Sequence, residues 1–172
     1  MKKLLSCMAI VLAVALTMTS CKKDEDTDSE ANRLKFTNAI MQNQISFTWE
    51  GLETAKVKNE GDKKQRYAVI RFDRASKEST MGTGRLVAFQ NFSKKDFIES
   101  SEFQWHFSND CLYLVWSHRG WQTAHAEYRT NELIVDASGF HGNWYESTSY
   151  RWEFKYSPSS FSDWDKYPAT SD

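Results

Sequence analysis

The residues EFQWHFSNDCLYLVW at positions 102–116 decide the fold class. In the first half, Phe103, Trp105 and Phe107 alternate with polar residues, which is the period-two pattern of a strand with one buried face. Polar residues at 108–110 form a turn sequence, and the apolar run at 111–116 returns as a second strand. Two strands with so short a connection predict an antiparallel hairpin.

Similar short segments recur on both sides of this hairpin. The alternation is strictest at 150–156, where aromatic residues alternate with Arg151, Glu153 and Lys155. A short helix or coil is expected at 31–44, where the apolar residues form no clean stripe. Further strands are expected at 46–50, 67–72, 85–90, 121–129, 133–137 and 140–145, with a glycine turn at 82–84.

The order of these segments predicts an all-β domain at residues 34–167, followed by a short tail at 168–172. No long amphipathic helix separates the strands, so parallel βαβ units are not expected. Antiparallel strands remove their exposed edges by closing on themselves. We therefore expect an antiparallel up-and-down barrel of about eight strands, with a β-sandwich as the alternative. Such a barrel is either filled by side chains or holds one small ligand.

The N-terminus has the features of an export signal. Lys2 and Lys3 precede an uncharged apolar run at 4–16, which is shorter than the ~20 residues that a membrane span needs. The segment Met18-Thr19-Ser20-Cys21 resembles the cleavage box of bacterial lipoproteins. That resemblance implies a signal peptide at 1–20 and a lipid anchor on Cys21, the alternative being an ordinary secretory signal with an incidental cysteine.

A charged segment follows the predicted anchor. Residues 21–33 contain few apolar side chains, so a flexible acidic tether is expected there. The Lys-Asp-Glu sequence at 23–25 resembles the acidic export signals of Bacteroidetes surface lipoproteins. This resemblance implies attachment to the outer membrane with exposure at the cell surface; an anchor that faces the periplasm is the alternative.

Composition narrows the possible partners. Cleavage before Cys21 would leave 152 residues with a net charge of −3 and no basic cluster, so nucleic acid is not an expected partner. Of three cysteines, only Cys111 would then remain with an unmodified thiol, so no disulfide within the chain is expected. The 11 Phe, 7 Tyr and 7 Trp residues indicate that aromatic packing stabilises the domain.

No catalytic or metal-binding set stands out. His125 and Glu127 form a close pair, but the Pro-Cys-x-x-Cys segment that completes a zinc deaminase site is absent from the sequence. No metal or cofactor is therefore expected, nor is an enzyme. A hydrolase with paired carboxylates remains an alternative, and its candidate pairs are Asp163 with Asp165 and Glu146 with Glu153.

Two groups of aromatic residues are candidates for binding. One group is expected inside the barrel, either as core or around a ligand cavity: Trp105, Trp116, Trp152 and Phe154. The other lies near glycines at strand ends, where it would close the barrel or form a stacking platform for sugars: Trp121, Trp144 and Tyr145.

Short motifs add a family resemblance. Trp49, followed closely by Gly51, resembles the first-strand signature of lipocalin-like barrels, in which the tryptophan closes one end. The motifs at 82–84, 103–105, 140–142 and 164–167 occur in the same order in small Bacteroidales lipoproteins with a lipocalin-like, or calycin-like, domain. The resemblance covers about residues 46–167. It implies a fold and a location in the cell envelope, but no catalytic residue.

These observations together lead to a functional hypothesis. We expect a lipid-anchored, non-catalytic module of the cell envelope that binds a small apolar ligand in the barrel, or a glycan or envelope protein at its rim. A carbohydrate-binding surface lipoprotein is the nearest alternative, and a purely structural envelope subunit is another.

Overall fold

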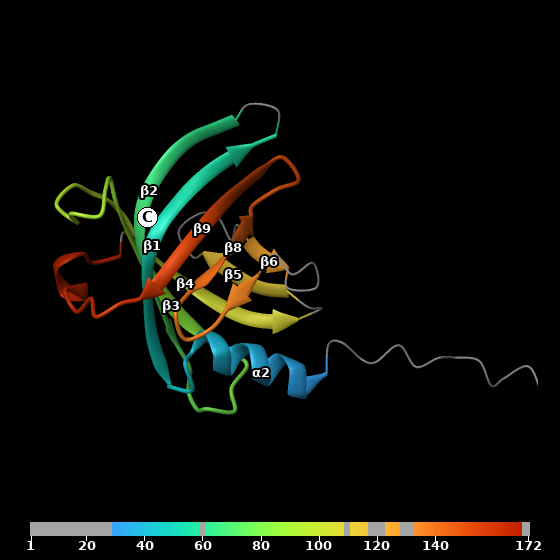
Figure 1. The fold of residues 1–172 in the computed structure, drawn as a ribbon. Helices are drawn as coiled ribbons and strands as arrows, with labels where there is room; N and C mark the ends of the chain where they lie inside the picture. The colour runs from blue at the N-terminus through green and yellow to red at the C-terminus, as the bar shows by residue number, and fades with distance from the viewer. Residues whose placement is uncertain (1–28, 59–60, 109–110, 117–122, 128–132, 170–172) are drawn as a thin grey trace, which may run out of the picture.

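The structure is a computed structural model that describes residues 29–58, 61–108, 111–116, 123–127 and 133–169. A strongly curved antiparallel sheet surrounds one interior, and helix α2 (Glu30–Ile40) lies across one end of it (Figure 1). Within the described residues the strands are β1 (Ser46–Val57), β2 (Gly61–Asp73), β3 (Met81–Phe89), β4 (Phe97–Ser108), β5 (Cys111–Trp116), β6 (Thr123–Glu127), β7 (Ile134–Val135), β8 (Phe140–Tyr145) and β9 (Tyr150–Pro158), and a 3₁₀ turn, η1 (Trp164–Lys166), follows.

The strand order confirms an all-β, up-and-down barrel of lipocalin-like type. Strands β1 to β5 each pair with the next strand along the chain, and β9 returns to pair with the free edge of β1. The sheet meets itself where His125 of β6 pairs with Tyr145 of β8, while the short β7 lies along another part of β8. The continuous pairing of neighbouring strands is that of a curled sheet and not of two packed sheets.

The predicted glycine turn at 82–84 is wrong, because these residues lie inside β3. Their role is to make room for rings on the neighbouring strand. A Cβ atom on Gly84 would lie 2.2 Å from the ring of Phe103, and one on Gly82 would lie 3.0 Å from the indole of Trp105. The glycines therefore allow the aromatic face of β4 to press against β3 inside the barrel.

Helix α2 begins before the predicted start of the domain. Ser29 is its N-cap, and the Ser29 hydroxyl accepts a hydrogen bond from the backbone N–H of Asn32 at 3.2 Å. Residues 30–33, predicted as part of the tether, therefore belong to the first turn of the helix. The predicted signal peptide, most of the tether and residues 170–172 of the predicted tail lie outside the described residues.

Trp49 closes the barrel at the α2 end. Its side chain is fully buried, and its indole N–H donates a hydrogen bond to the Ile40 carbonyl, the last residue of α2, at 2.8 Å. The ring centroids of Phe47 and Phe140 lie 4.9 and 5.7 Å from that of Trp49. This end of the interior is thus filled by aromatic side chains, as the lipocalin resemblance implies.

A second apolar cluster lies on the outer face of the barrel. Val69, Val87 and Phe89 point outward from β2 and β3, yet all three are fully buried. Residues 159–167, which we call the C-terminal strap, cover them with Trp164 and two flanking aromatic residues. Because the strap replaces solvent on this face, the middle of both strands is buried on two sides.

Glu50 holds the strap to the barrel. Its carboxylate accepts hydrogen bonds from Lys94 Nζ at 2.6 Å, from Ser159 Oγ at 2.5 Å and from the Tyr67 hydroxyl at 3.1 Å. Burial alone would raise the pKa of Glu50, but these three donors and the charge of Lys94 outweigh it and lower the pKa. Burial and the same carboxylate raise the pKa of Tyr67 to about 12, so its hydroxyl stays a donor.

The substitution Trp164→Ala is expected to destabilise the fold by about 3 kcal/mol, because it removes a large buried ring and uncovers the outer cluster. Urea unfolding followed by circular dichroism would measure the loss. Phe92→Ala is the control, since the Phe92 ring is 79% exposed and its removal should change stability by less than about 0.5 kcal/mol. Equal effects of the two substitutions would show that the strap does not stabilise the barrel.

Candidate functional site

The barrel interior changes from apolar to charged with distance from α2. Along the inner face of β1, Trp49 and Gly51 are followed by Glu53, which pairs in register with Arg66 of β2. On the inner face of β4, Glu99 lies toward the same end. The strand alternation that buries the aromatic residues also buries these charges, since every second residue points inward.

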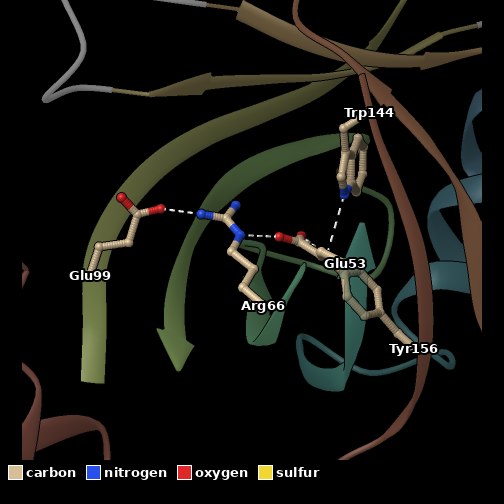
Figure 2. A network of polar contacts seen from close by, with 5 residues as sticks. All are labelled: Glu53, Arg66, Glu99, Trp144 and Tyr156. Carbon is tan, nitrogen blue, oxygen red and sulfur yellow. Dashed lines mark hydrogen bonds and ion pairs between the residues drawn. The ribbon is translucent and has the colours of Figure 1, made fainter. Parts of the chain in front are cut away.

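The charged groups form one connected network with Arg66 at its centre (Figure 2). Arg66 donates from Nε to Glu53 and from Nη1 to Glu99. The second oxygen of Glu53 accepts the hydroxyl proton of Tyr156, and the Trp144 indole N–H donates to the Tyr156 oxygen at 3.3 Å. We call these five residues the Arg66 network. Strands β1, β2, β4, β8 and β9 all contribute to it.

Burial and neighbouring charges shift the pKa values of Arg66 and Tyr156. Burial would lower the pKa of Arg66, but attraction to Glu53 and Glu99 outweighs it and raises that pKa above its ordinary range. Burial raises the pKa of Tyr156 well above its usual value, and the charge of Glu53 raises it further. Arg66 is therefore a cation and Tyr156 a hydrogen-bond donor, and the guanidinium of Arg66 bonds to both Glu53 and Glu99.

A small pocket adjoins the network at the end away from α2. It is lined by Arg66, Glu99, Ser101, Trp116 and Glu146 and has a volume of about 10 Å³, room for one water-sized group. The β8–β9 connection that carries Glu146 lies beside the β1–β2 end of the barrel, where the backbone N–H of residue 58 bonds to the carbonyl of residue 149. We call this cavity the open-end pocket.

Trp152 covers the guanidinium of Arg66. The guanidinium carbon lies 4.3 Å from the centroid of the Trp152 ring, a distance typical of a cation–π contact. The indole N–H of Trp152 is buried and has no hydrogen-bond acceptor among the described residues. Trp152 therefore contributes to this region through its ring and not through its polar atom.

The four aromatic residues predicted for the interior are all buried, but they serve different parts of it. Trp116 lines the open-end pocket and Trp152 lies on Arg66. Trp105 lies against β3, and its indole N–H donates to the carbonyls of Thr83 in β3 and Asp73 at the end of β2. Phe154 stacks against Trp144 with a centroid distance of 4.5 Å. These residues therefore do not surround one common cavity.

The residues predicted for the rim are also separated. Trp144 lies inside the barrel and is only 4% exposed, so it does not offer its ring to a sugar in solution. Tyr145 is its neighbour on β8, points to the outer face and is half-buried. Trp121 and the predicted lipid-bearing Cys21 lie outside the described residues.

Asp163 and Asp165, one carboxylate pair proposed for hydrolysis, are both exposed at the 3₁₀ turn η1. Glu146 lines the open-end pocket, whereas Glu153 lies on the outer face of β9 with its Oε2 atom 3.4 Å from Lys56 Nζ. Asp163 forms an exposed ion pair with Lys166 at 2.9 Å. In the described part of the chain, no three or more His, Cys, Asp and Glu side chains are grouped so that they could hold a metal ion.

A larger hollow of about 320 Å³ lies on the outer face of β2 to β5. Its two cations already have partners there. Arg71 Nε lies 2.9 Å from the Asp73 carboxylate, and Arg85 donates to the backbone carbonyl of Tyr167 in the strap. This hollow is therefore a depression between side chains that fasten the strap, and it is a weaker candidate than the barrel interior.

Comparison with protein-family models, with curated proteins and with solved structures found no match to this chain. Within the residues that the structure describes, no helix has the length and apolar character to cross a bilayer.

The charged residues of the network are not apparent in the sequence-based prediction. Arg66 immediately precedes the predicted strand at 67–72 but shares the inward phase of Ala68 and Ile70. Glu53 lies three residues beyond the predicted end of the first strand, in phase with Trp49. The available signal in the sequence was a charged residue at a position that the alternation assigns to the buried face of a strand.

The substitution Arg66→Met should destabilise the protein by about 3–5 kcal/mol, because it leaves the buried Glu53 carboxylate without its cation. The double variant Glu53→Gln with Arg66→Met should recover much of this loss, since it removes the buried charge and keeps an acceptor for Tyr156. Urea unfolding followed by tryptophan fluorescence would measure both.

Glu153→Gln is the matched control, because its ion pair with Lys56 is on the surface and should contribute less than about 1 kcal/mol. A double variant that is no more stable than Arg66→Met alone would contradict the coupling that the network requires.

Proposed function

We propose that this protein is a lipid-anchored, non-catalytic binding module of the cell envelope that takes a small ligand at the open end of its barrel. The observation that carries this proposal is the Arg66 network beside a pocket in the barrel interior. Buried ions often contribute nothing to stability compared with apolar side chains of similar size. Charge inside a barrel whose other end is filled by aromatic rings is therefore better explained by recognition than by folding.

The surroundings of the pocket suit a ligand with one polar group and an apolar body. Trp116 and the nearby ring of Trp152 supply apolar surface, while Glu99, Ser101 and Glu146 supply polar atoms. The pocket volume of about 10 Å³ admits only one small group, so the rest of the ligand would lie toward the barrel mouth.

The proposed location in the cell rests on the N-terminal sequence. An apolar run, small residues, Cys21 and a charged segment follow one another in the order of a lipoprotein signal. We place the anchor in the outer membrane of a Bacteroidales-type cell with the domain at the surface, the alternative being a domain that faces the periplasm. Cys21 and Glu30, the first residue of α2, are separated by a chain that spans at most about 30 Å when extended.

Two findings weigh against the alternative functions. Trp144, the central residue of the proposed sugar platform, is buried in the core. Glu146 and Glu153, proposed as a catalytic pair, come from opposite faces of the barrel wall.

Expression in a bacterial host should yield protein with a fatty-acylated Cys21 that fractionates with the envelope. Cys21→Ser should abolish incorporation of a labelled fatty acid and release the protein from the membrane fraction. Cys7→Ser and Cys111→Ser are matched controls that should keep the label, because neither cysteine follows the cleavage box. Acylation that persists in Cys21→Ser would refute the proposed anchor.

Ligand binding at the open end is tested with the unacylated Cys21→Ser protein and three six-carbon probes: hexylamine, hexanol and hexanoate. At least one probe should bind by isothermal titration calorimetry and change tryptophan fluorescence, because Trp116 and Trp152 adjoin the site.

Ser101→Phe should weaken binding of that probe at least tenfold, since the new ring occupies the pocket. Gln104→Phe lies on the outer face of the same strand and should leave binding unchanged. Absence of binding by all three probes, or equal loss in both variants, would count against a ligand site in the barrel.

A further inference from the structure

We infer that the hollow on the outer face of β2 to β5 binds a small hydroxylated carboxylate, such as a sugar acid, through Arg71 and Arg85. This site lies outside the barrel and is separate from the ligand site proposed above. Its volume of about 320 Å³ is at the lower end of the range typical of small-molecule sites. Three features lead to the assignment: the placement of the two arginines, their unused hydrogen-bond donors and the polar lining of the hollow.

The two arginines lie directly opposite each other on neighbouring strands. Arg71 of β2 pairs in register with Arg85 of β3, and like charges at such opposed positions repel each other. The indole of Trp164 in the strap lies against both guanidinium groups. Its ring centroid is 4.8 Å from the guanidinium carbon of Arg71 and 5.9 Å from that of Arg85. Both charges are thus held against one ring before any ligand arrives, and an anion bound between them would relieve their repulsion.

Attachment of the strap uses only part of the bonding capacity of these arginines, since a guanidinium carries five N–H donors. Arg71 donates from Nε to the Asp73 carboxylate, and its Nη1 and Nη2 atoms have no hydrogen-bond acceptor among the described residues. Arg85 donates from Nε to the Ser100 hydroxyl at 3.3 Å and from Nη2 to the Tyr167 carbonyl, and both acceptors are neutral. The two guanidinium groups are therefore bonded to one carboxylate between them.

A carboxylate is the group that best matches this arrangement. It can form two parallel N–H···O bonds with the end of a guanidinium, in a planar bidentate contact. The Nη1 and Nη2 atoms of Arg71 can make this contact while Nε keeps its bond to Asp73. Arg85 on the neighbouring strand adds the attraction of a second positive charge. A cationic group at the same place would meet two guanidinium groups and be repelled.

The rest of the hollow suits a body with hydroxyl groups. Thr83, Glu102 and Gln104 are exposed and line the hollow, while Val115 contributes an apolar side chain from β5. Oxygen atoms of all three polar side chains can accept hydrogen bonds from sugar hydroxyls, and Thr83 and Gln104 can also donate them. Because β3 separates Glu102 from Arg71, Glu102 would face the body of the ligand and not its carboxylate.

The test compares four probes with the unacylated Cys21→Ser protein at neutral pH: glucuronate, glucose, glucosamine and hexanoate. By isothermal titration calorimetry, glucuronate should bind at least tenfold more tightly than each of the others, because it alone combines a carboxylate with hydroxyl groups. Equal or tighter binding of glucose or glucosamine would overturn the role of the carboxylate, and that of hexanoate would overturn the role of the hydroxyl groups. Absence of glucuronate binding would overturn the whole assignment without bearing on the ligand site inside the barrel.

Arg71→Lys tests the bidentate contact, because lysine keeps the positive charge and loses the planar pair of donors. It should weaken glucuronate binding at least tenfold, with its folding checked by thermal melting because Arg71 also pairs with Asp73. Arg151→Lys is the matched control, since Arg151 is exposed on the outer face of β9, where its Nε atom donates to Asn143 at 3.1 Å. Unchanged affinity in Arg71→Lys, or equal weakening in both variants, would contradict a contact at Arg71.

Gln104→Phe locates the ligand without changing a charge or either arginine. The new ring fills the hollow from β4 and should weaken glucuronate binding at least tenfold. Binding of the six-carbon probes inside the barrel should stay as it was, which separates the two sites. Glucuronate affinity that is unchanged in Gln104→Phe would place that ligand elsewhere and overturn the assignment, even if Arg71→Lys failed to fold.

Discussion

Every second residue of each strand must share one enclosed interior, and this constraint decides where large rings and charges can lie. At the α2 end the space is taken by rings in mutual contact, with Trp49 fixed to the end of the helix through Ile40. Such packing is possible only because neighbouring positions are small. Gly84 is the clearest case, since any side chain there would occupy the position of the Phe103 ring.

The same constraint makes the other end chemically unusual. The side chains of Arg66 and Glu53 point from their strands into the barrel and cannot reach solvent from there. Each therefore finds its charged partner inside the barrel, in the other residue of the pair. Tyr156 and Glu99 complete the bonds that the pair requires. Because removal of any partner would leave a buried group without its bond, the network holds its members in one geometry. A rigid arrangement of charge is what selective binding needs, since little ordering remains to be done when a ligand arrives.

The sequence was informative about the walls of the barrel and less so about its interior. Alternation around Trp105 and Trp152 correctly indicated strands with buried aromatic faces, because the hydrophobic effect acts on each residue separately. The structural role of Gly82 and Gly84 depends instead on aromatic rings of the neighbouring strand β4. The turn preference of the local sequence therefore led to a wrong prediction. The Arg66 network likewise depends on residues up to 103 positions apart, as between Tyr156 and Glu53, and no local pattern encodes such a meeting.

The outer face of the barrel bears on the Arg66 network within. β2 carries Arg66 on its inner face and Val69 on its outer face, where the C-terminal strap covers it. β1 carries Glu53 inside and Glu50 outside, and Glu50 is the residue that receives Lys94 and Ser159. The strands that bear the central ion pair are thus held from outside by contacts that do not enter the barrel. Stability contributed by the strap therefore allows the open end to keep charged side chains where an apolar core would otherwise be needed.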